Sequence, residues 1–210
     1  MIKLTKQILI ISFVLLLLIS CKPYKLNGVT QKETIPDNFQ NLYFSESSTD
    51  FVYKAHIEVY GNNLSGILVA KKMNDSIHRI ALTTDFGNTL LDFELSEKDF
   101  KVNYIVSNLN RSFIISTLKK DFRLLLTMDH SVLSVFENKD DIIYKSYEDN
   151  SYNYFYQRKK DNIFYKLVNT SKTKEKVTFT FLAKNTTFAE SVLIQHYNIP
   201  LKIELNQINK

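Results

Sequence analysis

The sequence predicts a mainly β fold with some α structure (α+β): a single curved antiparallel sheet of about 11–12 strands, covered by one main amphipathic helix. Three observations predict it. Most of the chain after residue 50 alternates apolar and polar residues with a period of two, as half-buried strands do. The stretch from Asn108 to Met128 instead repeats its apolar residues at spacings of three and four, which indicates a helix. Short connections between these segments favour an antiparallel meander.

The first residues have the layout of a targeting segment and are excluded from the fold. Lys3 and Lys6 precede an apolar run, Ile8 to Ile19, that is too short to cross a bilayer of roughly 30 Å as a helix. The run ends in Leu18-Ile19-Ser20-Cys21, which resembles the lipobox of bacterial lipoproteins, in which the cysteine is acylated and becomes the new N-terminus. We therefore expect residues 1–20 to be a signal peptide and Cys21 to carry the lipid, palmitate among its acyl chains.

Two alternatives remain for this segment: an ordinary signal peptide with a chance cysteine, or an uncut N-terminal anchor. Cys21 is the only cysteine of the chain, so no internal disulfide competes for it. Several acyl chains on one residue anchor a protein stably, whereas a single chain binds marginally. A membrane partner through the lipid on Cys21 is therefore the expectation.

Residues 21–50 follow as a lipidated N-terminus and tether. They carry two of the three prolines and little periodicity, with a short helix expected near residues 38–42 as a first docking segment. The remaining range, 51–210, suffices for one domain with its own core.

The domain divides into strands on either side of the helix. Alternating patterns before it predict strands at 53–59, 64–71, 76–84, 91–95 and 100–106. The helix, expected with a break, carries the apolar stripe Ile115, Leu118, Phe122 and Leu125. The patterns after it predict strands at 131–137, 142–147, 152–157, 163–168, 177–183, 191–197 and 201–205.

No motif predicts catalysis, a metal or a cofactor. The four histidines lie far apart, and no second cysteine completes a thiolate site. The chain has no G-x-S-x-G turn, and the glycine of Ser65-Gly66 lies in a strand pattern, where it marks a bulge or a close backbone approach. Asp92 and Glu94 share one strand face, which we assign to solvent. We expect no enzyme; a serine or carboxylate meeting a histidine in one cleft would revive a hydrolase.

Aromatic residues supply the candidate ligand-binding site. Tyr152, Tyr154 and Tyr156 share one face of a predicted strand. A curved sheet lined with aromatic and aliphatic side chains can hold an apolar ligand, although the same residues can also make a packed core. The candidate ligand-binding residues are Tyr152, Tyr154, Tyr156, Phe179, Phe181, Leu118 and Phe122.

A lipobox followed by a meander, an amphipathic helix and further strands resembles the LolA/LolB superfamily, whose half-barrels close over helices and hold lipoprotein acyl chains. The stretch from Ser65-Gly66-Ile67-Leu68 to Phe122-Arg123-Leu124-Leu125 also resembles uncharacterised lipoproteins of Bacteroidota in that broad group. The resemblance spans about residues 51–205 by the order of elements and implies a half-barrel that binds an acyl chain or a lipidated partner. It carries over no single functional residue.

Location and partners follow from the residues after the cysteine and from the charge. Lys22-Pro23-Tyr24-Lys25 lacks an inner-membrane retention aspartate and an acidic surface-export cluster, so we expect the periplasmic face of the outer membrane. The formal charge of +5 includes Lys3 and Lys6, which leave with the signal, and no basic patch predicts nucleic acid as a partner. We expect a monomeric, non-enzymatic carrier- or receptor-like lipoprotein. The alternative is a structural or interaction module that docks an envelope complex without a ligand cavity.

Overall fold

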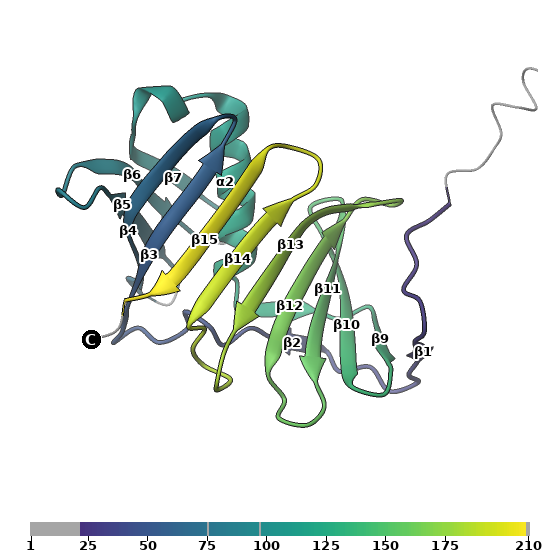
Figure 1. The fold of residues 1–210 in the computed structure, drawn as a ribbon. Coiled ribbons are helices and arrows are strands. Elements are labelled where there is room, and N and C mark those ends of the chain that lie inside the picture. Colours follow the sequence, from purple (N-terminus) through teal and green to yellow (C-terminus); the bar gives the residue numbers. More distant parts are fainter. Residues whose placement is uncertain (1–21, 75, 97, 209–210) are drawn as a thin grey trace, which may run out of the picture.

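The computed structural model describes residues 22–208 except 75 and 97, so the predicted signal peptide and Cys21 lie outside the described residues. Thirteen antiparallel strands form one curved sheet around the helix α2 (Ser112–Leu126) (Figure 1). The sheet does not close into a barrel, because its edge strands, β1 (Thr30–Gln31) and β7 (Phe100–Ile105), do not pair with each other. The predicted fold class, a curved antiparallel sheet with one main helix, is confirmed.

The sheet has the strand order β1-β9-β10-β11-β12-β13-β14-β15-β3-β4-β5-β6-β7. The strands of its first half are β9 (Ser134–Glu137), β10 (Asp141–Glu148), β11 (Ser151–Arg158), β12 (Phe164–Thr170), β13 (Glu175–Leu182), β14 (Ser191–His196) and β15 (Leu201–Gln207). Those of its second half are β3 (Asp50–Val59), β4 (Asn62–Lys72), β5 (His78–Thr83) and β6 (Thr89–Leu95).

The last strand joins the two halves of the sheet. β15 pairs with β3, so that Ile203 lies opposite Ile57 and Leu201 opposite Val59. Both strands alternate buried and accessible residues along most of their length, as the period-two pattern predicts. All four of these aliphatic side chains are at most 3% exposed, so the junction lies in the centre of the core.

The helix covers the concave face of the sheet. A short 3-10 turn, η1 (Ser107–Leu109), precedes α2, and the extended backbone of Arg111 between them makes the predicted break. Leu118, Phe122 and Leu125 recur at spacings of four and three and are at most 2% exposed. This stripe packs in one hydrophobic cluster with the inward residues of the sheet, and that packing holds the helix on the concave face.

The prediction of a tether as far as residue 50, with a helix near residues 38–42, is wrong. Residues Asn38–Gln40 form the strand β2, which pairs with β8 (Asp129–Ser131) and buries its middle residue, Phe39. Phe39 stacks on Phe155 with ring centroids 4.6 Å apart. Tyr43, 1% exposed, donates its hydroxyl to the Phe164 carbonyl oxygen at 2.6 Å. Residues 38–44 therefore belong to the core of the domain.

The predicted strand at 131–137 is two strands of different sheets. β8 pairs with β2, whereas β9 pairs with β10 and with β1. Between β8 and β9, Val132 donates its backbone N–H to Asp37 and Leu133 donates to Lys145. At this point the chain passes from the β2–β8 pair to the large sheet. Contacts with distant segments determine this change, so local alternation does not predict it.

A second, smaller cluster covers the outer, convex face of the sheet. Tyr24, Leu26 and Val29 pack against a patch around Tyr154, which is 4% exposed. The Tyr24 ring lies 5.2 Å from that of Tyr154, and its hydroxyl donates to Glu175 Oε1 at 2.9 Å. The first described residues are thus docked on the sheet.

Gly66 marks the close backbone approach that its place in a strand predicts. A Cβ atom built on Gly66 would lie 1.8 Å from the backbone oxygen of Thr83 on the neighbouring strand β5. No larger residue fits unless that backbone moves.

Candidate functional site

A mainly polar row, three polar residues and one valine, crosses the concave face near the end of four neighbouring strands; it is called the polar row below. Asn153 on β11 lies opposite Asn169 on β12, Asn169 opposite Val177 on β13, and Val177 opposite His196 on β14. Residues directly opposite in antiparallel strands point to the same face, so these side chains form one continuous row. Asn169 donates to the Asn153 amide oxygen at 2.7 Å, and Asn153 donates to Ser146 Oγ at 3.3 Å.

The next inward row, two residues along each strand, is apolar. It begins with Phe155, opposite Leu167, which lies opposite Phe179, which in turn lies opposite Ile194. All four are at most 1% exposed. The concave face therefore changes from apolar to polar within one step of the β pleat, close to the ends of the strands.

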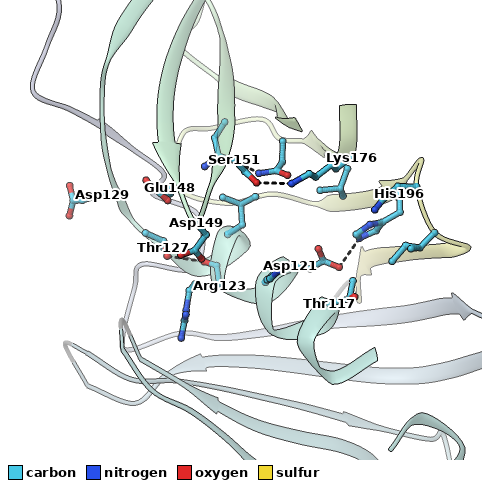
Figure 2. A pocket seen from close by; sticks show the side chains of 17 residues that line it. Thr117, Asp121, Arg123, Thr127, Asp129, Glu148, Asp149, Ser151, Lys176 and His196 are labelled. Carbon is cyan, nitrogen blue, oxygen red and sulfur yellow. Dashed lines mark hydrogen bonds and ion pairs between the residues drawn. The ribbon is translucent and has the colours of Figure 1, made fainter. Parts of the chain in front are cut away.

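Between this polar row and α2 lies a pocket of about 540 Å³ (Figure 2). The helix lines it with Thr117, Asp121 and Leu124, which recur every three or four residues, and Thr127 directly after the helix also lines it. The sheet contributes the polar row, and Ile199 of the β14–β15 turn adds an apolar side chain. The volume lies within the range of roughly 300–1,000 Å³ that is usual for small-molecule sites.

A buried histidine–carboxylate contact joins the helix to the sheet at this pocket. His196 Nε2 lies 2.8 Å from Asp121 Oδ2, and the two side chains are 6% and 4% exposed (Figure 2). Burial raises the pKa of the Asp121 carboxyl, and the hydrogen bond from His196 opposes that rise. Nε2 of His196 is paired with Asp121, whereas its Nδ1 is buried with no hydrogen-bond partner among the described residues.

A tight turn places a second polar group at the pocket. Asp149 and Asn150 have φ of 47° and 58°, as the two-residue hairpin turn between β10 and β11 requires. Ser151 follows directly, and Lys176 of β13 donates to its Oγ at 2.9 Å (Figure 2). Charged and hydrogen-bonding groups thus surround one end of the pocket.

A second histidine–carboxylate pair borders the same site. His130, fully buried on β8, has its Nδ1 2.9 Å from Oε1 of Glu148, which lines the pocket. Its Nε2 is buried and has no hydrogen-bond partner within the described part of the chain. The His130 ring lies 4.5 Å from the Phe155 ring, so this pair connects the apolar core to the pocket wall.

The seven predicted ligand-binding residues lie elsewhere, three on the outer face of the sheet and four in the core between the sheet and α2. Tyr152, Tyr154 and Tyr156 do share one face of β11, but it is the outer face, under the N-terminal segment. Burial raises the pKa of Tyr156 to about 12. Inside the concave core lie the other four, at most 4% exposed: Phe179, Phe181, Leu118 and Phe122. None of the seven lines the 540 Å³ pocket.

The polar lining was not predicted from the sequence, yet a signal for it exists. Asn153, Asn169 and His196 each occupy an inward position two residues from a buried apolar one: Phe155, Leu167 and Ile194. A polar residue on an otherwise apolar strand face indicates a binding site more clearly than the aromatic residues around it do, since buried polar groups need a partner or a function.

The chemistry available in the pocket is recognition by hydrogen bonds and charge. No cluster of three or more metal-ligating residues occurs among residues 22–74, 76–96 and 98–208. A serine, a carboxylate and a histidine do meet in one cleft, the condition set for a hydrolase. However, Ser151 Oγ accepts a hydrogen bond from Lys176, and His196 Nε2 is paired with Asp121. Neither nitrogen of His196 is therefore paired with the serine, as a general base would be.

No helix within the described ranges combines the length and the apolar character needed to span a bilayer. Asp92 lies on the outer face of the sheet, as predicted, but its side chain is only 14% exposed. It forms a bidentate pair with Arg79 at 2.6 and 3.0 Å, which holds the pKa of its carboxyl below the usual range.

An open antiparallel sheet curved around a helix, with its last strand paired to its first long strand, defines a LolA-like half-barrel. The structure is similar to the crystal structure of a LolA superfamily protein from Nitrosomonas europaea, with a TM-score of 0.52 over 80% of this chain and 87% of that chain. The two sequences are 8% identical, so the likeness concerns the fold. No protein-family model matches the chain, and no curated protein matches it.

Proposed function

We propose that this chain is a non-enzymatic lipoprotein, anchored by acyl chains on Cys21 to the periplasmic face of the outer membrane, that binds an acyl chain or a lipidated partner through the pocket beside α2. The observation that carries the proposal is the pocket itself: a site of about 540 Å³ inside an open half-barrel, where the sheet lining changes from apolar to polar. Such a boundary fits an amphipathic ligand, with a polar group on one side and an alkyl chain on the other.

Named residues have complementary roles in this binding mode. Leu124, Val177 and Ile199 offer apolar surface to alkyl carbons, and each buried methylene contributes about 0.8 kcal/mol. Asn169 and Lys176 offer hydrogen bonds to a carboxylate, amide or phosphate group at the polar end. The LolA-like fold supports the proposal by setting α2 against the concave face, where the pocket lies beside the helix, rather than by naming a ligand.

The binding test uses the full chain with Cys21→Ser, which cannot be acylated at that position, titrated with a fluorescent long-chain fatty acid. Leu124→Trp fills the pocket from the helix and is expected to weaken binding at least about tenfold, equivalent to roughly 1.4 kcal/mol. Leu133→Trp is the matched control, since Leu133 is 55% exposed and lies outside the pocket. Saturable binding that both variants retain equally would exclude this pocket as the site.

Anchoring is tested separately. The native chain is expected to incorporate labelled palmitate and to sediment with outer membranes, and Cys21→Ser is expected to lose both properties. Palmitate incorporation that survives Cys21→Ser would contradict the assignment of the anchor.

A docking role without a ligand is the second candidate, and one strand favours it. The edge strand β7 leaves Val102 and Tyr104 36% and 48% exposed, and an unpaired edge can accept a strand from another protein. A photo-crosslinker at Tyr104 in cells distinguishes the two: a discrete protein adduct, together with no fatty-acid binding in vitro, favours docking.

A further inference from the structure

The segment that follows the predicted lipid site is held against one end of the sheet. The backbone N–H of Tyr24 donates to the Lys172 carbonyl oxygen at 2.8 Å, in the turn between β12 and β13. Its hydroxyl bonds to Glu175 at the start of β13, and its ring packs on Tyr154. Figure 1 shows the N-terminal segment beginning beside this turn and then descending along the sheet to β1.

The docking limits how far an anchor at Cys21 can be from the sheet. Cys21 precedes Tyr24 by three positions, and an extended chain spans at most about 3.6 Å per residue, so three positions reach at most about 11 Å from Tyr24. An anchor at Cys21 therefore keeps the β12–β13 turn close to the membrane. The domain is not on a long free tether.

The same end of the sheet carries the pocket. In an antiparallel meander alternate turns lie on one side, and the strand registers place the turns at residues 149–150, 171–174 and 197–200 together. We call these three turns the pocket rim. Asp149 and Asn198, both exposed, belong to the rim and line the pocket.

The N-terminal segment and the neighbouring β12–β13 turn of the pocket rim are basic. Lys22 and Lys25 on the N-terminal segment and Lys172 and Lys174 on the β12–β13 turn are all exposed. None of the four takes part in a salt bridge recorded among the described residues. Glu175 beside them is bonded to Tyr24, while Glu148 and Asp149 lie on the neighbouring turn. Lysines close to an anionic lipid surface each contribute about fivefold to membrane affinity.

We infer that the docked segment Tyr24–Gln31 orients the domain, so that the lysines of the pocket rim face the anionic lipid surface in which Cys21 is anchored and the pocket opens toward that membrane. The inference rests on the proposed anchoring at Cys21 and deepens it by naming the face and the lipid. A pocket held in this way exchanges an amphipathic ligand directly with the bilayer, without reorientation of the domain.

The test compares the two ends of β13 in the full acylated chain, reconstituted in vesicles of phosphatidylcholine and phosphatidylglycerol that carry a quencher on the lipid headgroup. Thr173→Cys lies on the pocket rim and Thr186→Cys in the β13–β14 turn at the opposite end; both threonines are exposed. The eight residues of β13 separate them by about 26 Å. With Cys21 acylated, a thiol-reactive fluorophore labels the new cysteine alone.

The expected result is that the label at residue 173 loses most of its fluorescence while the label at residue 186 keeps most of its own. Tyr24→Ala, which removes the ring contact and the Glu175 hydrogen bond, is expected to abolish this difference although the protein still floats with the vesicles. Circular dichroism confirms that the variant remains folded.

Charge is tested with Lys172→Gln and Lys174→Gln together, which are expected to reduce the difference in phosphatidylglycerol vesicles and to leave pure phosphatidylcholine vesicles unaffected. Equal quenching at both positions in a protein that floats overturns the orientation and leaves the anchoring intact. A difference that persists in Tyr24→Ala also overturns it. A chain that neither floats nor carries an acyl group overturns the anchoring itself, and the orientation with it.

Discussion

His196 on β14 and Asp121 on α2 meet through a 2.8 Å contact in which both side chains are almost fully buried. This contact joins helix to sheet beside the pocket, and the two substitutions Asp121→Asn and Asp121→Ala separate its hydrogen bond from its charge. Asparagine keeps an acceptor for His196 Nε2 and removes a buried charge, so we expect the free energy of unfolding to stay the same or rise at neutral pH.

Alanine has the opposite effect, because it leaves both nitrogens of His196 buried without a partner. We expect Asp121→Ala to lower the free energy of unfolding by about 1–3 kcal/mol. Urea denaturation of the two variants and the native chain measures this. A loss in Asp121→Asn as large as that in Asp121→Ala would show that the negative charge, and not the hydrogen bond alone, stabilises the contact.

The same carboxyl predicts a pH dependence. Burial raises its pKa in the folded state, so the folded chain binds this proton more tightly than the unfolded chain does. The stability contribution of Asp121 is therefore fully present below its unfolded pKa of about 4, and is lost as the pH rises through the folded pKa. We expect the stability of Asp121→Asn relative to the native chain to increase with pH from about 4 upward and then level off. Denaturation at a series of pH values measures this difference; a constant difference would contradict the assignment.

The fold follows from local patterns more fully than the site does. Alternation along β3 and β15 and the three-four spacing of Leu118 and Phe122 predict the elements, since each element buries one face. The pairing of β15 with β3 and the division of residues 131–137 between two sheets depend on contacts between distant segments. No local period encodes them.

The pocket cannot be predicted from the sequence for a related reason. Aromatic side chains such as Tyr152, Tyr154 and Phe179 predict an apolar site because they offer large apolar area, and the structure divides them between two faces of the sheet. The candidate pocket is lined where Asn169 and His196 interrupt apolar positions. The position of α2 decides which strand ends lie opposite the helix, and therefore where the pocket forms.

Residues 38–44 are expected to be essential for stability although the sequence places them in a tether. Phe39 is 4% exposed and packs against Phe155 and Phe164 with ring centroids 4.6 and 5.1 Å away. Phe39→Ala should therefore lower the free energy of unfolding by about 3–5 kcal/mol. Ile35→Ala, four residues earlier and 42% exposed, should change it by less than about 0.5 kcal/mol. Chemical denaturation compares them, and equal effects would place residue 39 outside the core.

Gly66 offers a sharper steric test. An added Cβ meets the Thr83 carbonyl oxygen at 1.8 Å, so β4 and β5 must separate locally to admit even alanine. We expect Gly66→Ala to cost about 1–3 kcal/mol, whereas alanine usually stabilises a strand relative to glycine. Ser65→Ala, at the neighbouring exposed position, is the control and should stay within about 0.5 kcal/mol of the native chain. Thermal and urea unfolding should agree on the order of the two variants.

The docking of the N-terminal segment can be measured without a membrane, by limited trypsin digestion. The bond after Lys25 lies between Tyr24 and Leu26, both packed on the outer face, so cleavage there requires local undocking. Tyr24→Phe loses only the bond to Glu175 and should accelerate this cleavage by about 2–12-fold, which corresponds to 0.5–1.5 kcal/mol. Tyr24→Ala also loses the ring contact and should accelerate it further. Cleavage after Lys160, in an exposed turn far from the segment, should keep its rate in both variants. If all three chains are cut after Lys25 at one rate, the segment is free in solution, and the geometry that places Cys21 beside the pocket rim does not hold.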